Sequence, residues 1–159
     1  MTVVDLGAAP GGWTQVAVKR AKAGRDTPIV AMDILPMDPV PGAVILTQDF
    51  TSDEAPGALE AAFGGRRPNL VLSDLAPETT GHRATDHLRI VHLVELAHDF
   101  AKQTLAPGGA FLAKVFQGGT EGGLLAELRR DFASVKHVKP PASRSASPET
   151  YVLATGFRG

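Results

Sequence analysis

Cysteine is absent from this chain of 159 residues, which excludes disulfide bonds, thiolate metal ligands and a cysteine nucleophile. Long apolar runs are absent too, since no stretch approaches the roughly 20 apolar residues that a membrane-spanning helix needs. The N-terminus lacks the basic segment and apolar core of a signal peptide. We therefore expect a cytoplasmic protein with no membrane partner.

Neither sign of charge dominates, because 16 basic and 17 acidic residues leave a formal net charge of −1. Any nucleic-acid binding must then come from a local basic patch rather than from the overall charge. The chain has five histidines, but no two have the i, i+4 spacing of a helical zinc site. The serines lack the G-x-S-x-G setting of a hydrolase nucleophile. The sequence therefore predicts no metal site and no serine hydrolase.

Length and hydrophobic pattern predict a single α/β domain over residues 1–159. Apolar runs alternate with helical patterns, which is typical of a mostly parallel sheet with helices on both faces. Near the C-terminus, strands 135–139 and 150–155 have no helix between them, so we expect an antiparallel hairpin at the sheet edge. This is the Rossmann-like, seven-stranded arrangement of class I methyltransferases. The other expected elements are strands 2–6, 28–33, 43–47, 69–73 and 110–115, and helices 13–22, 55–63, 86–105 and 122–132.

A short apolar strand at residues 3–6 (VVDL) leads directly into a loop of small residues at 7–13 (GAAPGGW). Such a loop lets the backbone approach a bound cofactor closely. The glycine spacing does not match the G-x-G-x-x-G of dinucleotide sites, and Asp5 suits a cationic ligand better than a pyrophosphate. S-adenosylmethionine, which carries ammonium and sulfonium groups, fits both observations. An ordinary strand-to-helix turn is an equal alternative for a single loop of this kind.

Four aspartates lie at or just after the ends of predicted strands: Asp5, Asp33, Asp49 and Asp74. Ligands of open α/β sheets bind beyond the carboxyl ends of the strands, so these residues are expected to line one site. Asp33 lies about twenty residues past the glycine loop, where a carboxylate can accept hydrogen bonds from ribose hydroxyls. Asp49 could receive an adenine amino group. Each aspartate alone could be a cap or turn residue, but four at strand ends favour a site.

Lys114 is the only polar residue of the strand at 111–116 (FLAKVF). We expect it to be buried, which favours the neutral amine that a general base needs. The alternative is a lysine that reaches the strand end and only packs there. Glu149 begins the last strand, where the alternative is a surface carboxylate. Residues 51–53 (TSD) are expected to cap the following helix.

Six segments together resemble the FtsJ/RrmJ family of ribosomal RNA 2′-O-methyltransferases and span almost the whole chain in the family's order. The combination of DLGAAPGGW, SDLAP and KVFQG is highly specific. The six segments are VVDLGAAPGGWTQ (3–15), DILPMDP (33–39), QDF (48–50), LSDLAPETTG (72–81), LAPGGAFLAKVFQG (105–118) and SPETYVLATG (147–156).

The resemblance implies S-adenosylmethionine as cofactor and a Lys-Asp-Lys-Glu catalytic tetrad. Its last three members would be Asp74, Lys114 and Glu149, with Lys114 as the base for a ribose 2′-hydroxyl. The family's first lysine lies in a helix ahead of the first strand, which has no counterpart here, and we expect that segment to be missing. The implied cofactor contacts, together with those expected from the glycine loop, are Asp5, Gly7, Gly11, Gly12, Trp13, Asp33, Asp49 and Asp74.

The implied substrate is a uridine in 23S ribosomal RNA, presented within the large (50S) ribosomal subunit to a monomeric enzyme. Without cysteine, methylation at pyrimidine C5 is disfavoured. Residues 73–76 (SDLA) also lack the Asn/Asp-Pro-Pro-aromatic pattern used on exocyclic amines. A basic rim for RNA could be formed by Arg66, Arg67, His82, Arg83, Lys136, Lys139 and Arg144.

Three alternatives remain at this point. The first is a ribose 2′-O-methyltransferase that acts on tRNA or an mRNA cap. The second is a catalytically weak protein that binds cofactor and RNA during ribosome assembly, which the absent first lysine would explain. The third, a nucleotide-dependent oxidoreductase, is disfavoured by the glycine spacing and by Asp5.

Overall fold

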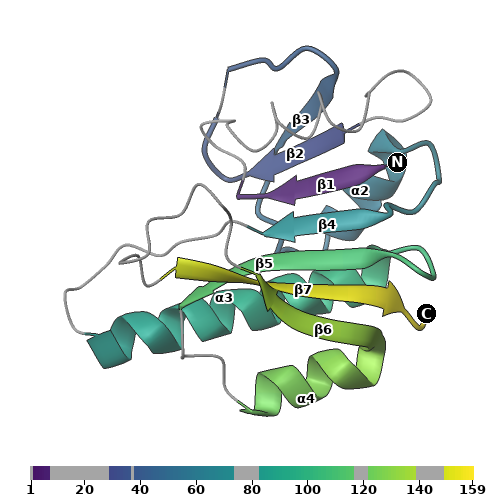
Figure 1. The fold of residues 1–159 in the computed structure, drawn as a ribbon. Helices are drawn as coiled ribbons and strands as arrows, with labels where there is room; N and C mark the ends of the chain where they lie inside the picture. The colour runs from purple at the N-terminus through teal and green to yellow at the C-terminus, as the bar shows by residue number, and fades with distance from the viewer. Residues whose placement is uncertain (1, 8–28, 37, 74–82, 117–121, 139–148) are drawn as a thin grey trace.

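The structure is a computed structural model, which describes residues 2–7, 29–36, 38–73, 83–116, 122–138 and 149–159. Seven strands form one sheet in the order β3-β2-β1-β4-β5-β7-β6 (Figure 1). The strands are β1 (Val3–Leu6), β2 (Ile29–Asp33), β3 (Ala43–Thr47), β4 (Leu70–Ser73), β5 (Ala110–Phe116), β6 (Phe132–Val138) and β7 (Glu149–Phe157). The described helices are α2 (Ala55–Ala62), α3 (Arg83–Thr104) and α4 (Gly122–Asp131).

The strand directions confirm the predicted mixed sheet. Strands β1 to β5 pair in parallel, whereas β7 pairs antiparallel with both β5 and β6. The last strand therefore lies inside the sheet, and β6 is the outer strand. The two largest shifts of an expected boundary are three residues each: α3 begins at Arg83 instead of residue 86, and β6 begins at Phe132 instead of residue 135, directly after α4. The side chain of Phe132 is buried, which explains why an extended backbone already starts there.

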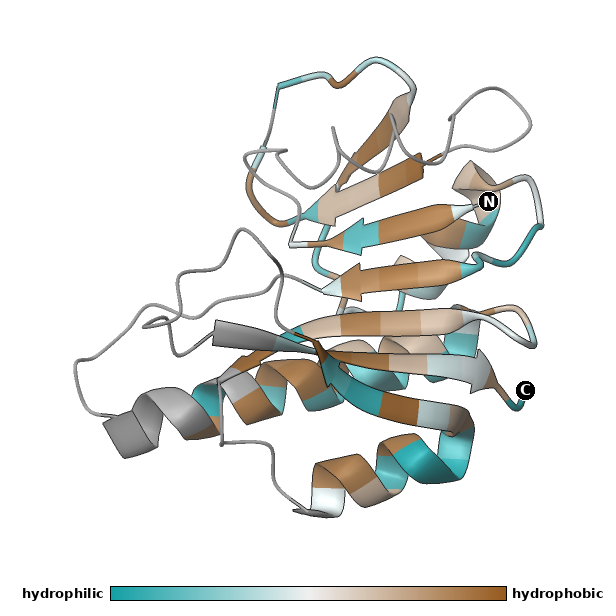
Figure 2. Cartoon of the chain, in the orientation of Figure 1, coloured by the Kyte–Doolittle hydropathy of each residue, from teal (hydrophilic) through white to brown (hydrophobic). Residues whose placement is uncertain are grey.

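One face of the sheet, which we call the packed face, carries most of the apolar core. Alternate residues of each strand point to this face, as the period of two requires, and meet α2, α3 and α4. Figure 2 shows the apolar colour concentrated on the central strands. All three described helices lie on this face, and the helix expected at 13–22 falls outside the described residues. Core members from the strands are Val4, Leu6, Val30, Met32, Val71, Phe111, Ala113 and Val115, and from the helices Leu59, Val94, Phe100 and Leu128.

The opposite face, which we call the polar face, has only a small apolar cluster of Val3, Ile29 and Leu72 among the described residues. Strand alternation places Asp5, Asp33 and Lys114 on this same face. The two faces of each strand are therefore chemically different.

Helices α3 and α4 are joined beneath the packed face by His98, which is buried, and Asp131, which is partly buried. The His98 ring packs against Phe111 and Phe132, with each ring centroid 6.1 Å away. Its Nε2 is 3.0 Å from Asp131 Oδ2, although the two groups are not aligned as a regular hydrogen bond. Burial lowers the pKa of His98 below its ordinary value of 6.5 and outweighs the opposing effect of Asp131. The imidazole is therefore neutral at pH 7.

None of the three described helices has the combination of length and apolar composition that crossing a bilayer requires.

Candidate functional site

The carboxyl ends of the parallel strands meet at one edge of the sheet, which we call the carboxyl edge (Figure 1). Leu6 at the end of β1 is level with Met32 and Ser73 on the neighbouring strands. Ser73 is in turn level with Ala113 of β5, so Lys114 extends one residue past the end of β4. Asp74, the next residue of the chain after Ser73, lies outside the described residues. Ligands of open α/β sheets bind at this edge.

Gly7 begins the glycine loop in a conformation that favours glycine. Its φ is +68°, in the left-handed region, and its backbone N–H donates to Met32 O at 2.9 Å. Gly7 is therefore held beside the end of β2. The predicted contacts Gly11, Gly12 and Trp13 lie outside the described residues.

Asp5 lies in β1 with no exposed surface, between Ala31 and Leu72 of the neighbouring strands. Removing a carboxylate from water is unfavourable, so an acid at this central position is not explained by packing. It lies on the polar face, two residues before Gly7. This position agrees with the predicted role in holding a cationic ligand, which stays a prediction.

Asp33 and Asp49 follow β2 and β3 at the carboxyl edge. The backbone N–H of Leu35 donates to Asp33 Oδ1 at 2.9 Å, and that of Gln48 donates to Asp33 O at 2.8 Å. Asp49 Oδ1 accepts bonds from both the N–H (2.9 Å) and the Oγ1 hydroxyl (2.7 Å) of Thr51. These bonds lower the pKa of the Asp49 carboxyl. Asp49 is therefore a fixed, ionised acceptor at neutral pH.

The capping role expected for residues 51–53 is wrong. The N-cap of α2 is Glu54, and no side chain makes a cap hydrogen bond there. Thr51 is engaged with Asp49, and Ser52 Oγ donates to Asp49 O at 2.8 Å. The polar side chains thus form the turn after β3 rather than the start of the helix.

Sequence reasoning missed two apolar side chains between the aspartates. Ile34 and Leu35 follow Asp33 directly and are 66% and 61% exposed. Large apolar side chains with this much exposure, next to hydrogen-bonding carboxylates, are suited to the face of a flat ring. The available signal was the pair itself, since two apolar residues come between the end of a strand and Pro36.

Lys114 lies in a row of three neighbours on the polar face. It pairs with Tyr151 of β7, and Tyr151 pairs with Val138 of β6. Lys114 is partly exposed, so the expected burial is wrong. The reason is strand alternation, which turns Ala113 and Val115 into the core and Lys114 away from it.

The backbone of Glu149 is opposite Phe116, two residues before Tyr151 in the same strand. Tyr151 is a second residue that sequence reasoning missed. It is the only tyrosine of the chain and follows the predicted catalytic Glu149 by two positions, which was the available signal.

The described residues of the predicted basic rim lie in different parts of the structure. Arg66 and Arg67 lie between α2 and the start of β4, so they are at the opposite edge of the sheet from Asp33 and Lys114. Lys136 lies in β6, and Arg83 begins α3. His82, Lys139 and Arg144 are outside the described residues.

Two cavities of about 130 and 160 Å³ lie between α2 and α3 and share Pro56 and Gln103. Neither is lined by Asp33 or Lys114, but the second is lined by Thr51 and Ser52 of the turn that holds Asp49. Among the residues that the structure describes, no group of three or more His, Cys, Asp or Glu side chains could hold a metal ion. The described side chains at the carboxyl edge include carboxylates, the Lys114 amine and apolar groups.

Comparison with known proteins identifies similar sequences over the whole chain. The family model for FtsJ-like methyltransferases matches residues 1–157. The chain is 59% identical to the ribosomal RNA large subunit methyltransferase E of Paramagnetospirillum magneticum, over all of this chain and 66% of that protein. It is also 59% identical to the protein of the same name from Novosphingobium aromaticivorans, over 99% of this chain and 69% of that protein. The chain thus spans about two thirds of the length of these curated relatives.

Solved structures show the same fold. A crystal structure described as a ribosomal RNA methyltransferase of Plasmodium falciparum superposes with a TM-score of 0.86 at 26% identity, over 99% of this chain and 87% of that one. The fibrillarin/Nop5p complex superposes with a TM-score of 0.62 at 16% identity, over 98% of this chain and 72% of that one. The second likeness concerns the fold alone. Together they confirm the predicted Rossmann-like methyltransferase architecture.

Proposed function

Since this chain belongs to the FtsJ-like methyltransferase family, we propose that it transfers a methyl group from S-adenosylmethionine to RNA. The acceptor in this proposal is the ribose 2′-hydroxyl of a uridine in 23S ribosomal RNA, within the large ribosomal subunit. The observation that supports the proposal is that Asp33, Asp49 and Lys114 lie at the same edge of the sheet. The names of the curated relatives favour ribosomal RNA over tRNA or an mRNA cap.

The described residues fit this cofactor. Asp33 and Asp49 offer carboxylates to the hydroxyl and amino groups of adenosine, and Ile34 and Leu35 offer an apolar surface to its ring. Buried Asp5 offers negative charge to the cationic amino-acid end, and Gly7 keeps the backbone clear. When bound, S-adenosylmethionine supplies an electrophilic methyl group. Gly11, Gly12, Trp13 and Asp74 complete the pocket in this proposal.

Lys114 is the catalytic base in this mechanism. Its amine would take the proton of the ribose 2′-hydroxyl while that oxygen gains the methyl group, which the sulfonium would give up to become a neutral thioether. A positioned base of this kind contributes about 10²–10⁴-fold to the rate. Tyr151, beside Lys114 in the adjacent strand, orients the ribose. Asp74 and Glu149 hold the Lys114 amine in position. Orientation of the two reactants supplies a further part of the acceleration.

The test is single-turnover transfer of labelled methyl from S-adenosylmethionine to undermethylated 50S subunits, with the modified nucleotide mapped. Transfer to one ribose 2′-oxygen is expected, and Lys114→Ala should reduce it by about 10²–10⁴-fold while cofactor binding persists. Full turnover by Lys114→Ala would remove Lys114 from the mechanism. An N-terminally extended version of the chain is tested in parallel. Cofactor binding without transfer by both versions would favour a non-catalytic role in ribosome assembly.

A further inference from the structure

Exposed charges are distributed unevenly between the two outer strands of the sheet. From β2 to β4, five exposed carboxylates accompany two exposed arginines, Arg66 and Arg67. Around β6, the described side chains of α4, β6 and residues 151–159 include one exposed carboxylate, Glu127, and four exposed cations. The four cations, which we call the β6 patch, are Arg129, Arg130, Lys136 and Arg158. A chain with a net charge of −1 thus presents a positive surface beside β6.

The β6 patch begins next to Lys114. Lys136 pairs with Leu153, and Leu153 pairs with Leu112, so Lys136 is on the polar face with Lys114. Lys136 is two residues from Val138, the third member of the row formed by Lys114 and Tyr151. A continuous strip of the polar face therefore connects Lys114 to the outer strand.

The arginines of the patch lie at the other end of β6. Arg129 and Arg130 are in the last turn of α4, which ends at Asp131 immediately before β6. The backbone N–H of Arg158 donates to Asp131 O at 2.9 Å, and its Nη2 donates to Phe132 O at 3.4 Å. Seven residues of strand span roughly 20 Å, so the patch extends over several nucleotides of an RNA chain.

Local structure does not account for the whole patch. Cations in the last turn of a helix complement its dipole, which is a sufficient reason for Arg129 and Arg130. The helix dipole does not explain the exposed charges of Lys136, which lies in a strand, and Arg158, which follows β7. Asp131, the other described carboxylate here, is 17% exposed and already within 4 Å of His98, Lys102 and Arg130. The exposed cations therefore exceed what the fold itself neutralises.

We propose that the β6 patch binds the phosphodiester backbone of the substrate RNA as it leads away from the nucleotide at Lys114. The identity of the RNA rests on the proposed function. Arginine suits this ligand because its planar guanidinium donates two parallel hydrogen bonds to a phosphate. The interaction is independent of base sequence, so the patch holds the RNA in position and the carboxyl edge selects the reacting ribose.

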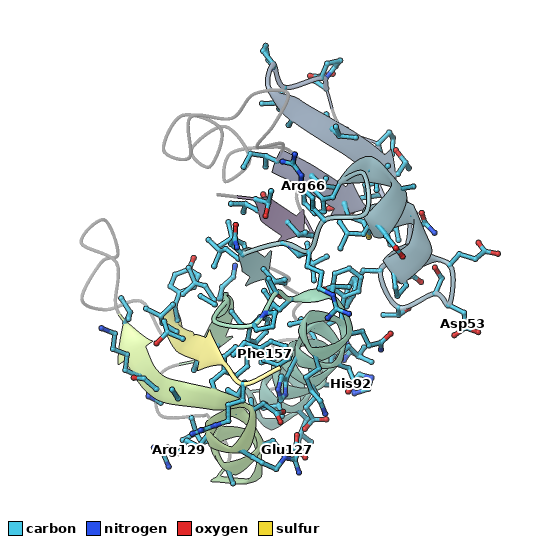
Figure 3. The ribbon with its side chains drawn as sticks, turned by 90° about the vertical axis from the view of Figure 1, so that its right-hand side faces the viewer. Asp53, Arg66, His92, Glu127, Arg129 and Phe157 are labelled. Carbon is cyan, nitrogen blue, oxygen red and sulfur yellow. The ribbon has the colours of Figure 1, made fainter. Side chains whose placement is uncertain are left out.

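The test uses two matched tandem-arginine variants of the full-length protein, R129Q/R130Q and R66Q/R67Q. Arg66 lies in the upper half of the view in Figure 3, whereas Arg129 lies near its lower end. Affinity for deproteinised 23S ribosomal RNA and for undermethylated 50S subunits is measured over a series of salt concentrations. R129Q/R130Q should reduce the slope of log K against log salt by about 1.4–1.8, since each lost phosphate contact removes about 0.7–0.9. R66Q/R67Q should keep the wild-type slope.

Lys136→Gln is a second variant, because Arg130 also contacts Asp131 and its replacement could disturb the fold. It should reduce the slope by about 0.7–0.9 with an unchanged melting temperature and unchanged S-adenosylmethionine affinity. Wild-type slopes in both R129Q/R130Q and Lys136→Gln, or an equal loss in R66Q/R67Q, would overturn the proposal. A loss seen with 50S subunits but not with deproteinised RNA would also overturn it and indicate a ribosomal protein as the partner.

The inference and the proposed function fail in different ways. Methyl transfer by the wild type with unaltered slopes in the variants would count against the β6 patch alone. A wild-type protein that neither binds these RNAs nor methylates them would overturn both.

Discussion

The packed face and the polar face of the sheet consist of alternate residues of the same strands, yet they meet different demands. In β5, Phe111, Ala113 and Val115 are fully buried against α3, whereas Leu112 and Lys114 between them are only partly buried. The packed face excludes water and holds the chain together. The polar face carries Asp5, Asp33 and Lys114. A period of two thus allows one short strand to supply both core and chemistry.

The comparison also shows where each face tolerates a polar group. On the packed face, His98 is accommodated by ring contacts with Phe111 and Phe132 and by Asp131. On the polar face, the charged groups Asp33 and Lys114 keep partial contact with solvent at the carboxyl edge. Substitutions on the packed face should therefore change stability, and those on the polar face should change binding and turnover.

The largest effect is expected from Phe111→Ala on the packed face. Removing this fully buried ring should lower the free energy of unfolding by about 3–5 kcal/mol, because the site cannot refill. Lys114→Ala, three residues away on the other face, should change it by less than about 1 kcal/mol. Chemical denaturation of both variants measures the difference. Similar losses of stability in the two variants would contradict the view that the packed face contributes more to stability than the polar face.

A smaller effect is expected from Asp33→Ala on the polar face. Losing this acceptor should weaken S-adenosylmethionine binding by about 1–3 kcal/mol, the usual consequence of leaving a ligand donor without its partner. Isothermal titration calorimetry measures the affinity. Asp53→Ala is the matched control, since Asp53 is an exposed aspartate in the following turn. Equal affinities in the wild type and Asp33→Ala would show that Asp33 does not contact the adenosine.

The pH dependence of stability tests the buried histidine of the packed face. The pKa of His98 is lowered in the folded state by burial, so the unfolded chain binds the proton more readily. The free energy of unfolding is therefore unaffected by the titration of His98 above about pH 6.5, where the imidazole is neutral in both states. It decreases as the pH falls below that value toward the pKa of His98 in the folded state. The slope reaches at most about 1.4 kcal/mol per pH unit for one proton.

The measurement is chemical denaturation of the wild type and of His98→Gln between about pH 5 and 8. The free energy of unfolding of the wild type should fall relative to that of His98→Gln as the pH decreases, because glutamine does not titrate. Asp131→Asn should extend the loss to lower pH, since the Asp131 charge raises the pKa of His98. A constant difference between the wild type and His98→Gln at every pH would contradict the prediction.

The smallest effect is expected from Thr51→Ala at the carboxyl edge. The variant lacks the hydroxyl that donates to Asp49 Oδ1, so the pKa of Asp49 should rise toward its ordinary value of 3.8. Carboxyl NMR titration measures the shift. Thr51→Ser keeps the hydroxyl and should keep the lowered pKa. If the pKa of Asp49 were equally low in Thr51→Ala, the hydrogen bond from the backbone N–H at position 51 would alone account for the lowering.

The parallel strands were predictable because each is a short, mostly apolar run. Residues 43–47 are an example, predicted and observed with the same ends. The insertion of β7 between β5 and β6 could not be read in this way, since strand pairing depends on contacts far apart in the sequence. The start of β6 at Phe132 was missed because burial of that ring, rather than local propensity, ends α4.

The site was predictable to the extent that it lies at strand ends. Asp33 and Asp49 follow their strands at the carboxyl edge, and Lys114 lies just past the level of Ser73, as expected. The exposure of Ile34 and Leu35 and the pairing of Tyr151 with Lys114 depend on tertiary register, which a single sequence does not display. The catalytic and cofactor-binding roles of all the predicted site residues stay predictions.

The interior position of β7 has a consequence for the order in which the molecule is made. β7 follows every other strand of the sheet in the sequence, yet β5 and β6 can be joined only through it. On the ribosome, Lys114 is synthesised well before its neighbour Tyr151, so the nascent chain holds an incomplete strip with two open strand edges. The polar face is thus completed only after β7 has been synthesised and has entered the sheet between β5 and β6.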